Sequence, residues 1–264
     1  MLRNITLGQF FPGDTIVHRL DPRTKIILTM LYITALFIMR SFAGYIIMLA
    51  VLFAALILSK IRIGSVARAI RPILILITLT ALINLFVTTG TVMVEFWIFS
   101  ITHEGLFAAV FMAGRLLMLI VGTFMLTYTT SPIALTDGLE KLLSPLKIVR
   151  LPVHELAMMM SIALRFIPTL LEETDKIISA QKARGANFET GGPIKRAKAI
   201  LPIIIPLFVS SFRRADELAI AMESRCYHGG EGRTRMKTLK MTLRDYAALI
   251  LGVGMVAVVV WVRN

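Results

Sequence analysis

The sequence predicts an all-α membrane protein, with about five membrane-spanning helices and a cytoplasmic region of amphipathic coupling helices. Hydrophobic residues make up 56% of the chain and the mean hydropathy is +0.77, well above the apolar share of ordinary soluble domains. Several apolar runs are long enough for a bilayer core, which needs about 20 residues in a helix. A long polar and basic segment lies between the last two of these runs.

The spans are predicted in chain order from these apolar runs. Asp21 is expected to cap the first helix, with Pro22 at its first position, where the missing N–H of proline has no cost. The apolar run that follows is too long for one crossing and contains a polar break, so we expect two helices joined by a tight hairpin. The predicted segments are two spans within Ile26–Leu58 with the hairpin at Arg40–Gly44, then Pro72–Val87, Gly105–Tyr128 and Tyr246–Val262.

The distribution of basic residues predicts the orientation of the chain. Its formal net charge is +13, and Lys and Arg gather in the cytoplasmic connections of membrane proteins. The connection Thr88–Glu104 contains no Lys or Arg and is therefore expected outside, with the N-terminus in the cytoplasm. We predict a four-span membrane domain at residues 1–128, a cytoplasmic coupling region at 129–244 and a last transmembrane helix at 245–264.

Two apolar stretches inside the basic region allow two interpretations. Leu156–Leu171 contains Arg165 and Pro168, and Ile200–Val209 is short and carries two prolines. We interpret both as helices that lie along the membrane interface or pack on the membrane domain. The alternative is an additional pair of spans, which would leave the orientation of the other elements unchanged.

Two helix-favouring runs, 179–185 and 221–227, each end with an arginine between two small residues. From Pro168 onward, apolar positions recur at helical spacing, and Gly185 is expected to be the left-handed residue that ends this first arm. The second arm has Cys226 in the place of glycine. We therefore expect the second arm to run another half turn before it stops.

Arg184 and Arg225 are the candidate binding residues of the two arms. A guanidinium group is a planar fork of donors that binds carboxylates or carbonyls of a partner at two points. The alternative is that each arginine offsets its own helix dipole or contacts lipid phosphates. Because both ends follow amphipathic arms, we expect them to dock to a partner. Charged residues such as Glu173 and Arg214 fall on the face opposite each apolar stripe.

Several function classes find no support in the sequence. The single cysteine excludes an internal disulfide and a Cys-based zinc cluster, and the four histidines are far apart. Basic residues are not interleaved with aromatics on a soluble domain, so nucleic acid is not expected as a partner. The sequence contains no Gly-x-x-x-x-Gly-Lys-Ser/Thr loop that would hydrolyse ATP. We expect a non-catalytic protein without a metal or a cofactor.

In the order and spacing of its motifs, the chain resembles the transmembrane coupling subunit of energy-coupling-factor (ECF) transporters, the CbiQ/EcfT-like family. These are ABC-type importers of vitamins and metal ions in prokaryotic plasma membranes. The resemblance covers nearly the whole chain. The motifs that carry it are Gly8-Gln9-Phe10, Pro12-Gly13-Asp14, His18–Lys25, Leu164–Pro168, Ala183-Arg184-Gly185, Ser224-Arg225-Cys226 and the tail Gly229–Arg235.

The resemblance implies a scaffold that joins two ABC-type ATPases to a small membrane subunit, which captures the substrate for vitamin or micronutrient uptake. It implies that Ala183, Arg184 and Gly185 dock to one ATPase. Ser224, Arg225 and Cys226 would dock to the other, although Ser224 and Cys226 depart from the usual Ala-Arg-Gly. The ATP-driven motion of the partners would then swing the arms.

Arg115 and the run of three methionines at 158–160 are candidate contacts with the substrate-binding subunit. Arg115 falls near the middle of a predicted span, where a charge is costly and usually buried or functional. It is expected either to contact that subunit or to pair within the bundle, with Asn84 or a backbone carbonyl. The flexible side chains of Met158, Met159 and Met160 can repack against different partners.

Two other classes of transporter are the rival interpretations. A channel-forming permease of a conventional ABC importer carries one cytoplasmic coupling loop, whereas this chain has two arms that end in arginine. A secondary carrier needs carboxylates within the membrane and usually inverted repeats. Neither feature is found in the sequence.

Overall fold

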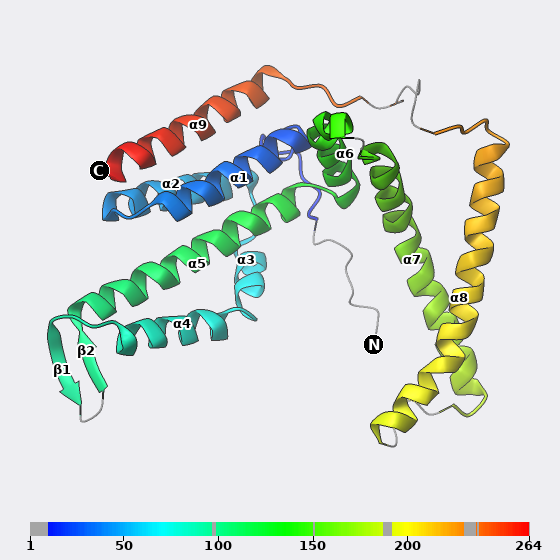
Figure 1. The fold of residues 1–264 in the computed structure, drawn as a ribbon, viewed down its shortest axis with the longest axis horizontal. Helices are drawn as coiled ribbons and strands as arrows, with labels where there is room; N and C mark the ends of the chain where they lie inside the picture. The colour runs from blue at the N-terminus through cyan, green and yellow to red at the C-terminus, as the bar shows by residue number, and fades with distance from the viewer. Residues whose placement is uncertain are drawn as a thin grey trace. The chain divides into compact units, whose positions relative to one another are not determined.

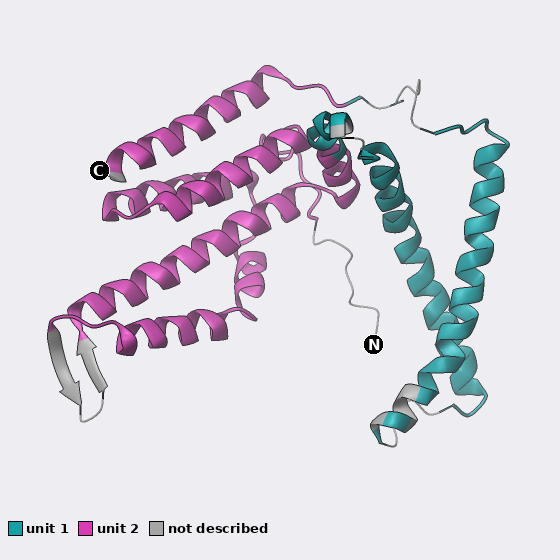
Figure 2. Cartoon of the chain, viewed as in Figure 1, with its two compact units in different colours: residues 1–7, 140–238 teal, residues 8–139, 239–264 magenta. Residues whose placement is uncertain are grey.

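The computed structural model describes residues 10–96, 99–149, 151–186, 192–229, 236 and 238–263. Gly8, Gln9 and residues 230–235, which belong to the motifs above, lie outside this part of the chain. The described chain is predominantly helical, with one short β-hairpin, and the predicted all-α class is confirmed (Figure 1). The described residues divide into two compact units: those within 140–238 form unit 1, and those within 10–139 and 239–263 form unit 2 (Figure 2).

Unit 2 contains all of the predicted spans, most of them close to their predicted bounds. Its first helix begins as expected, because Asp21 is the N-cap, Pro22 lies at the first helical position and the Asp21 carboxylate accepts a hydrogen bond from the backbone N–H of Arg23. The elements are α1 Pro22–Ile38, α2 Phe42–Ser59, α3 Ile63–Ile70, α4 Leu74–Val87, β1 Val92–Phe96, β2 Phe99–Thr102, α5 His103–Thr129, the first turns of α6 Pro132–Leu143, and α9 Leu243–Arg263.

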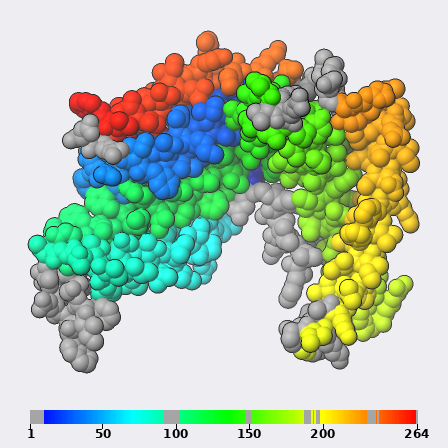
Figure 3. All heavy atoms as spheres, viewed as in Figure 1, coloured from blue at the N-terminus to red at the C-terminus, as the bar shows by residue number. Residues whose placement is uncertain are grey.

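The core of unit 2 forms where α1 packs against α5 and α9, helices that are far apart in the sequence. In the space-filling view, the side chains of these three helices leave no visible gap between them (Figure 3). Because lipid tails are as apolar as these side chains, the contact between membrane helices is stabilised by close van der Waals packing rather than by removal of surface from water. The fully buried apolar side chains of the core include Ala35, Leu36, Met39, Met48, Met118 and Val259.

One predicted span differs from the structure. Pro72–Val87 was expected to be a single crossing after a basic connection, but the connection itself forms the short helix α3. Helix α4 has only 14 residues, and α3 and α4 are bent by 61° at the break between them. Proline has no backbone N–H to continue a helix, and Pro72 lies within this break. The β1–β2 hairpin that follows α4 was not predicted.

Four of the described helices are long and apolar enough to cross a membrane, and the bent α3–α4 pair would add a fifth crossing. The four are α2, α5, α7 and α9. This set includes α7, which we interpreted from the sequence as interfacial. It omits α1, whose 17 residues span only about 26 Å, against about 30 Å of hydrocarbon. Counting the bent pair, the described helices give five candidate spans, as predicted. The set differs from the predicted one in containing α7 instead of α1.

Unit 1 contains the two predicted arms, and both are longer than expected. Helix α7 is Val153–Ala183 and α8 is Pro193–Glu223, preceded by the 3₁₀ segment Ser144–Val149. The stretches Leu156–Leu171 and Ile200–Val209, which were interpreted as separate helices, are parts of α7 and α8, and Pro168 and the two prolines of α8 lie inside these continuous helices. Residues late in α7 contact residues early in α8, as shown by the hydrogen bond from Gln181 Nε2 to the Pro202 carbonyl at 3.4 Å. The two helices are therefore antiparallel (Figure 1).

Candidate functional site: two helix ends that present an arginine

The end of α7 has the geometry that the sequence predicts. Gly185 has a φ of +86°, in the left-handed region that glycine adopts without strain. Its backbone N–H donates to the carbonyl oxygen of Lys182 at 3.0 Å, and the N–H of Ala186 donates to that of Gln181 at 3.0 Å. These two bonds satisfy carbonyl groups that a helix end otherwise leaves unpaired, which is the Schellman arrangement. Arg184 is the residue immediately before the turn.

The end of α8 repeats this arrangement bond for bond. Cys226 has a φ of +56°, and its N–H donates to the carbonyl oxygen of Glu223 at 2.9 Å. The N–H of Tyr227 donates to that of Met222 at 3.0 Å. The expected extra half turn was therefore wrong, because Cys226 itself adopts the left-handed conformation despite the steric penalty of its Cβ. Arg225, like Arg184, is the residue immediately before the left-handed residue that ends its helix.

The six residues predicted to dock to ATPases are all exposed: Ala183, Arg184, Gly185, Ser224, Arg225 and Cys226. Within the described chain, neither Arg184 nor Arg225 has a side-chain hydrogen bond or ion pair with another residue. Each guanidinium can therefore bind an external group without first breaking a contact inside the protein. The residues form two separate sites, because they lie at opposite ends of the antiparallel pair.

The pair is held together by a polar contact that the sequence analysis did not identify. Glu173 and Arg214 were placed on the charged faces of their arms, but Arg214 Nη2 lies 2.6 Å from Glu173 Oε2, and the hydroxyl of Ser210 donates to the other carboxylate oxygen. Both side chains are partly buried. The sequence does carry a signal for this contact, because an acidic residue in one arm and a basic residue in the other lie the same number of residues before the arm-end arginines.

The spacing makes the pair nearly symmetric about this ion pair. Glu173 precedes Arg184 by eleven residues, and Arg214 precedes Arg225 by eleven. Eleven residues are close to three helical turns and about 16 Å of rise. The two exposed arginines therefore lie at equal distances from the contact, in opposite directions along the pair.

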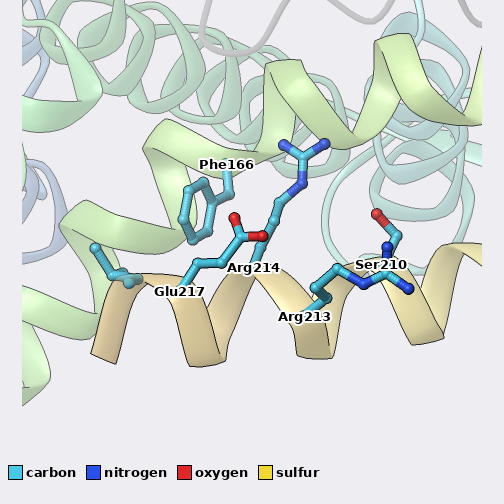
Figure 4. A pocket seen from close by; sticks show the side chains of 6 residues that line it. Phe166, Ser210, Arg213, Arg214 and Glu217 are labelled. Atoms are coloured by element: carbon cyan, nitrogen blue, oxygen red, sulfur yellow. The ribbon is translucent and has the colours of Figure 1, made fainter. Parts of the chain in front are cut away.

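A cleft of 490 Å³ runs beside this contact and is lined by residues of both helices. In Figure 4, Arg214 extends from α8 toward α7, and the Glu217 carboxylate lies near the ring of Phe166. Arg213 also lines the cleft but is exposed. The cleft belongs to the crossing of the arms, and none of the predicted docking residues lines it.

Arg115 lies in unit 2, whereas the arm ends belong to unit 1. Its Nη2 donates to the backbone carbonyl of Met39 at 2.8 Å, just after the last residue of α1, where unpaired carbonyls and the helix dipole favour a cation. Two partners within the bundle were expected for Arg115, a backbone carbonyl or Asn84, and the structure shows the backbone carbonyl. The Asn84 side chain instead donates to the Thr80 carbonyl at 2.9 Å. A contact of Arg115 with another subunit stays a prediction.

The three methionines lie in the first turns of α7, in the same unit as the arm ends. Met159 and Met160 are 54% and 45% exposed, and Met158 is half-buried. Such exposure of flexible apolar side chains is compatible with contact to lipid or to a membrane partner. Their role as a subunit contact also stays a prediction.

Comparison with known proteins connects these features to a family. The sequence profile of the family CbiQ, described as cobalt transport protein, matches residues 13–236. The chain is 55% identical over 257 residues to the energy-coupling factor transporter transmembrane protein EcfT of Thermosediminibacter oceani, covering 97% of each chain. It is 53% identical to the EcfT of Clostridium kluyveri over 98% of this chain and 96% of the relative. The EcfT of Brevibacillus brevis is 48% identical over the full length of both chains.

Proposed function

The chain belongs to the cobalt transport protein family CbiQ, and we propose that it is the transmembrane coupling subunit of an ECF-type importer for vitamins or other micronutrients. In this role it joins two ABC-type ATPases to a separate small membrane subunit that binds the substrate. The observation that carries the proposal is the repeated helix end, with an exposed arginine followed by a left-handed residue at Gly185 and at Cys226.

Two equivalent ends favour two equivalent partners. The arms are nearly symmetric about the Glu173–Arg214 ion pair, so a pair of similar ATPases related by a two-fold axis can each receive one arginine. In each socket, the guanidinium would bind a carboxylate or carbonyl group at two points, which fixes the orientation of the arm as well as its position. A partner that moves would then move the arm with it.

Both ends must lie in the cytoplasm to reach ATPases. Because α7 and α8 are antiparallel, a pair that crossed the membrane would place Arg184 on one side and Arg225 on the other. We therefore propose that the pair lies along the cytoplasmic surface, with its apolar side toward the bilayer. The seven charged residues of α7 support this orientation over a crossing. Residues 129–244 and the N-terminus would then be cytoplasmic.

The chain supplies mechanical coupling, and its partners supply the chemistry. ATP binding and hydrolysis by the two ATPases would change the separation of the sockets and swing the arms. The exposed methionines of α7 would contact the substrate-binding subunit and repack as the arms move. Arg115 would contribute to that contact from the membrane domain. A permease that forms its own channel is the alternative that the experiment must exclude.

Affinity purification of the tagged chain from its native membrane in mild detergent tests the proposal. We expect two ATPase chains and one small hydrophobic protein to co-elute. Arg184→Glu and Arg225→Glu should each release an ATPase, because an acidic side chain repels the carboxylates or carbonyls that bind arginine. Lys182→Glu and Arg213→Glu are the matched controls. Both residues are exposed, and each substitution changes the net charge by the same amount as Arg184→Glu or Arg225→Glu.

Two results would contradict the proposal. One is a purified chain that transports as a homodimer without other proteins, which would favour a carrier. The other is full retention of both ATPases by the Arg184→Glu and Arg225→Glu variants. Release by the control variants as strongly as by these two would show that net charge, rather than the arm ends, holds the ATPases.

A further inference from the structure

Pro206 leaves one carbonyl oxygen of α8 without its usual partner in the helix. In an α-helix each backbone N–H donates to the carbonyl four residues earlier, and proline has no N–H. The carbonyl of Pro202 therefore lacks this donor, although α8 continues unbroken through both prolines. Pro202 in turn removes the donor for the carbonyl one turn earlier. Two hydrogen bonds missing from successive turns weaken this part of α8, because a helix bends most easily at its prolines.

Gln181 of α7 supplies a donor to this free carbonyl. Its side-chain Nε2 donates to the carbonyl oxygen of Pro202 at 3.4 Å. The terminal amide of glutamine is a donor that can reach from one helix to the next, and Gln181 is partly buried. The contact is tied to the proline, because any other residue at position 206 would have an N–H to donate to the same carbonyl.

The Gln181 contact lies in register with the Glu173 contact. Glu173 accepts a hydrogen bond from the hydroxyl of Ser210. It lies eight residues before Gln181 on α7, and Ser210 lies eight residues after Pro202 on α8. The two contacts are thus separated by about 12 Å of rise along both helices. Helix α7 therefore holds α8 on both sides of Pro206, and rotation of the arms about one contact must break the other.

The two arm ends differ in this respect. Gln181 lies three residues before Arg184, less than one turn from the end of α7. The residue at the same position before Arg225 is Met222, whose thioether has no hydrogen to donate. Met222 therefore cannot tie the Arg225 end to the neighbouring helix as Gln181 ties the Arg184 end.

We propose that Gln181 is a positioning residue, which holds the Arg184 end of α7 at a fixed angle to α8 by supplying the hydrogen bond that Pro206 cannot make. The consequence for binding rests on the proposed function, because an end that is already held in place binds an ATPase more tightly than a loose one. A single hydrogen bond between helices contributes little net free energy. A partner that moves can therefore break this bond and allow it to form again.

Spin-label distances within unit 1 test the geometric part of the proposal without any partner. The labels are attached at Lys176→Cys in α7 and Lys198→Cys in α8, in a full Cys226→Ser chain in lipid nanodiscs; both labelled positions are exposed. We expect one narrow distance distribution. Gln181→Met should broaden it, because methionine has a similar length and helix propensity but no donor. Ser179→Met, at an exposed position of the same helix, should keep it narrow.

Removing the proline isolates the proposed cause. In a Pro206→Ala chain the restored N–H donates to the carbonyl of residue 202, so Gln181→Met should no longer broaden the distribution. Pro202→Ala is the matched control, since it also removes a proline from α8 but leaves that carbonyl without a backbone donor. Circular dichroism checks that the compared variants keep their helix content. A peak that stays narrow in Gln181→Met, or equal broadening with and without Pro206, would overturn the proposal.

ATPase binding measures the consequence at each arm end. In an Arg225→Glu chain only the Arg184 end binds, and Gln181→Met should weaken ATPase binding about threefold, the size expected for one lost hydrogen bond. In an Arg184→Glu chain the same substitution should leave the Kd unchanged. Equal weakening at both ends would contradict the assignment. Failure of the proposed function itself would appear as ATPase retention by both glutamate variants, while the effect of Gln181 on the spin-label distances persists.

Discussion

Glu173 and Arg214 form an ion pair, with Oε2 and Nη2 2.6 Å apart, midway between the two exposed arginines that end α7 and α8. The contact joins the helices near the middle of the pair, and a hydrogen bond from Gln181 Nε2 to the Pro202 carbonyl joins them again. Each exposed arginine lies eleven residues, or about 16 Å of helical rise, from its own member of the ion pair. The ion pair therefore lies where the two arms would pivot if their ends follow the movement of two partners.

Reversing the charges of the ion pair tests this role of the crossing. Glu173→Arg and Arg214→Glu should each loosen the contact between α7 and α8, because each places like charges opposite one another. The double variant should restore most of the loss, with a coupling energy of about 1 kcal/mol for a partly exposed pair. Thermal unfolding of the four proteins measures that coupling. Arg213→Glu is the control, and additivity of the two single variants would contradict the assignment.

The left-handed residues at the two arm ends predict opposite responses to substitution. Gly185→Ala should destabilise the last turn of α7 by about 1 kcal/mol, because a Cβ is strained at positive φ. Cys226→Gly should relieve the same strain in α8, reduced by the larger conformational freedom of glycine in the unfolded chain. Hydrogen exchange of the Ala186 and Tyr227 amides reports each effect. Gly64→Ala is the control, and faster exchange at Tyr227 in Cys226→Gly would contradict this account.

Asp245 is expected to be among the most sensitive polar positions of unit 2. Asp245→Ala leaves the N–H groups of Asp21 and Thr242 without their acceptor in a buried site. It also removes one negative charge from a cluster whose other charged members are Asp21, Arg23 and Lys25. The expected loss of stability is about 3 kcal/mol or more, measured as a lower Tm of the purified chain. Asp216→Ala, at an exposed position of α8, should leave Tm nearly unchanged. A similar small effect at Asp245 would show that the cluster is not tightly packed.

Replacing the arm arginines by lysine separates charge from geometry. Arg184→Lys and Arg225→Lys keep the positive charge but lose two-point binding. We expect each to weaken ATPase binding at its own arm end by about tenfold, equivalent to about 1.4 kcal/mol, while each glutamate variant abolishes binding at that end. Titration of purified ATPases onto the immobilised chain gives the Kd values. Binding by the lysine variants at unchanged Kd would indicate that charge alone is recognised.

The sequence allowed good prediction where local signals agree with the final structure. Asp21 and Pro22 begin α1, the apolar runs of α2, α5 and α9 are helices, and Gly185 ends α7. Each depends on residues close in the chain, such as a cap, an unbroken apolar run or a glycine at a helix end. Such features need no knowledge of what packs against them.

The failures arose where neighbours in space decide the structure. The apolar stretches that contain the prolines are continuous with the arms, because contacts along the antiparallel pair can outweigh a lost backbone hydrogen bond. Cys226 ends α8 in a conformation that its Cβ disfavours. The pairing of Glu173 with Arg214 depends on the register of two helices, which no local pattern contains. The hydrogen bond from Arg23 Nη2 to the Leu239 carbonyl likewise joins residues that are far apart in the sequence.

Labelling of the two arm ends from each side of the membrane tests the central claim most directly. Cys226 is exposed and adjoins Arg225, so the native thiol reports one end. Ala183→Cys in a Cys226→Ser chain reports the other. We predict that a membrane-impermeant maleimide labels both positions in inside-out vesicles stripped of peripheral proteins and neither in intact cells. Labelling of either position in intact cells, or protection of either from both sides, would contradict the account.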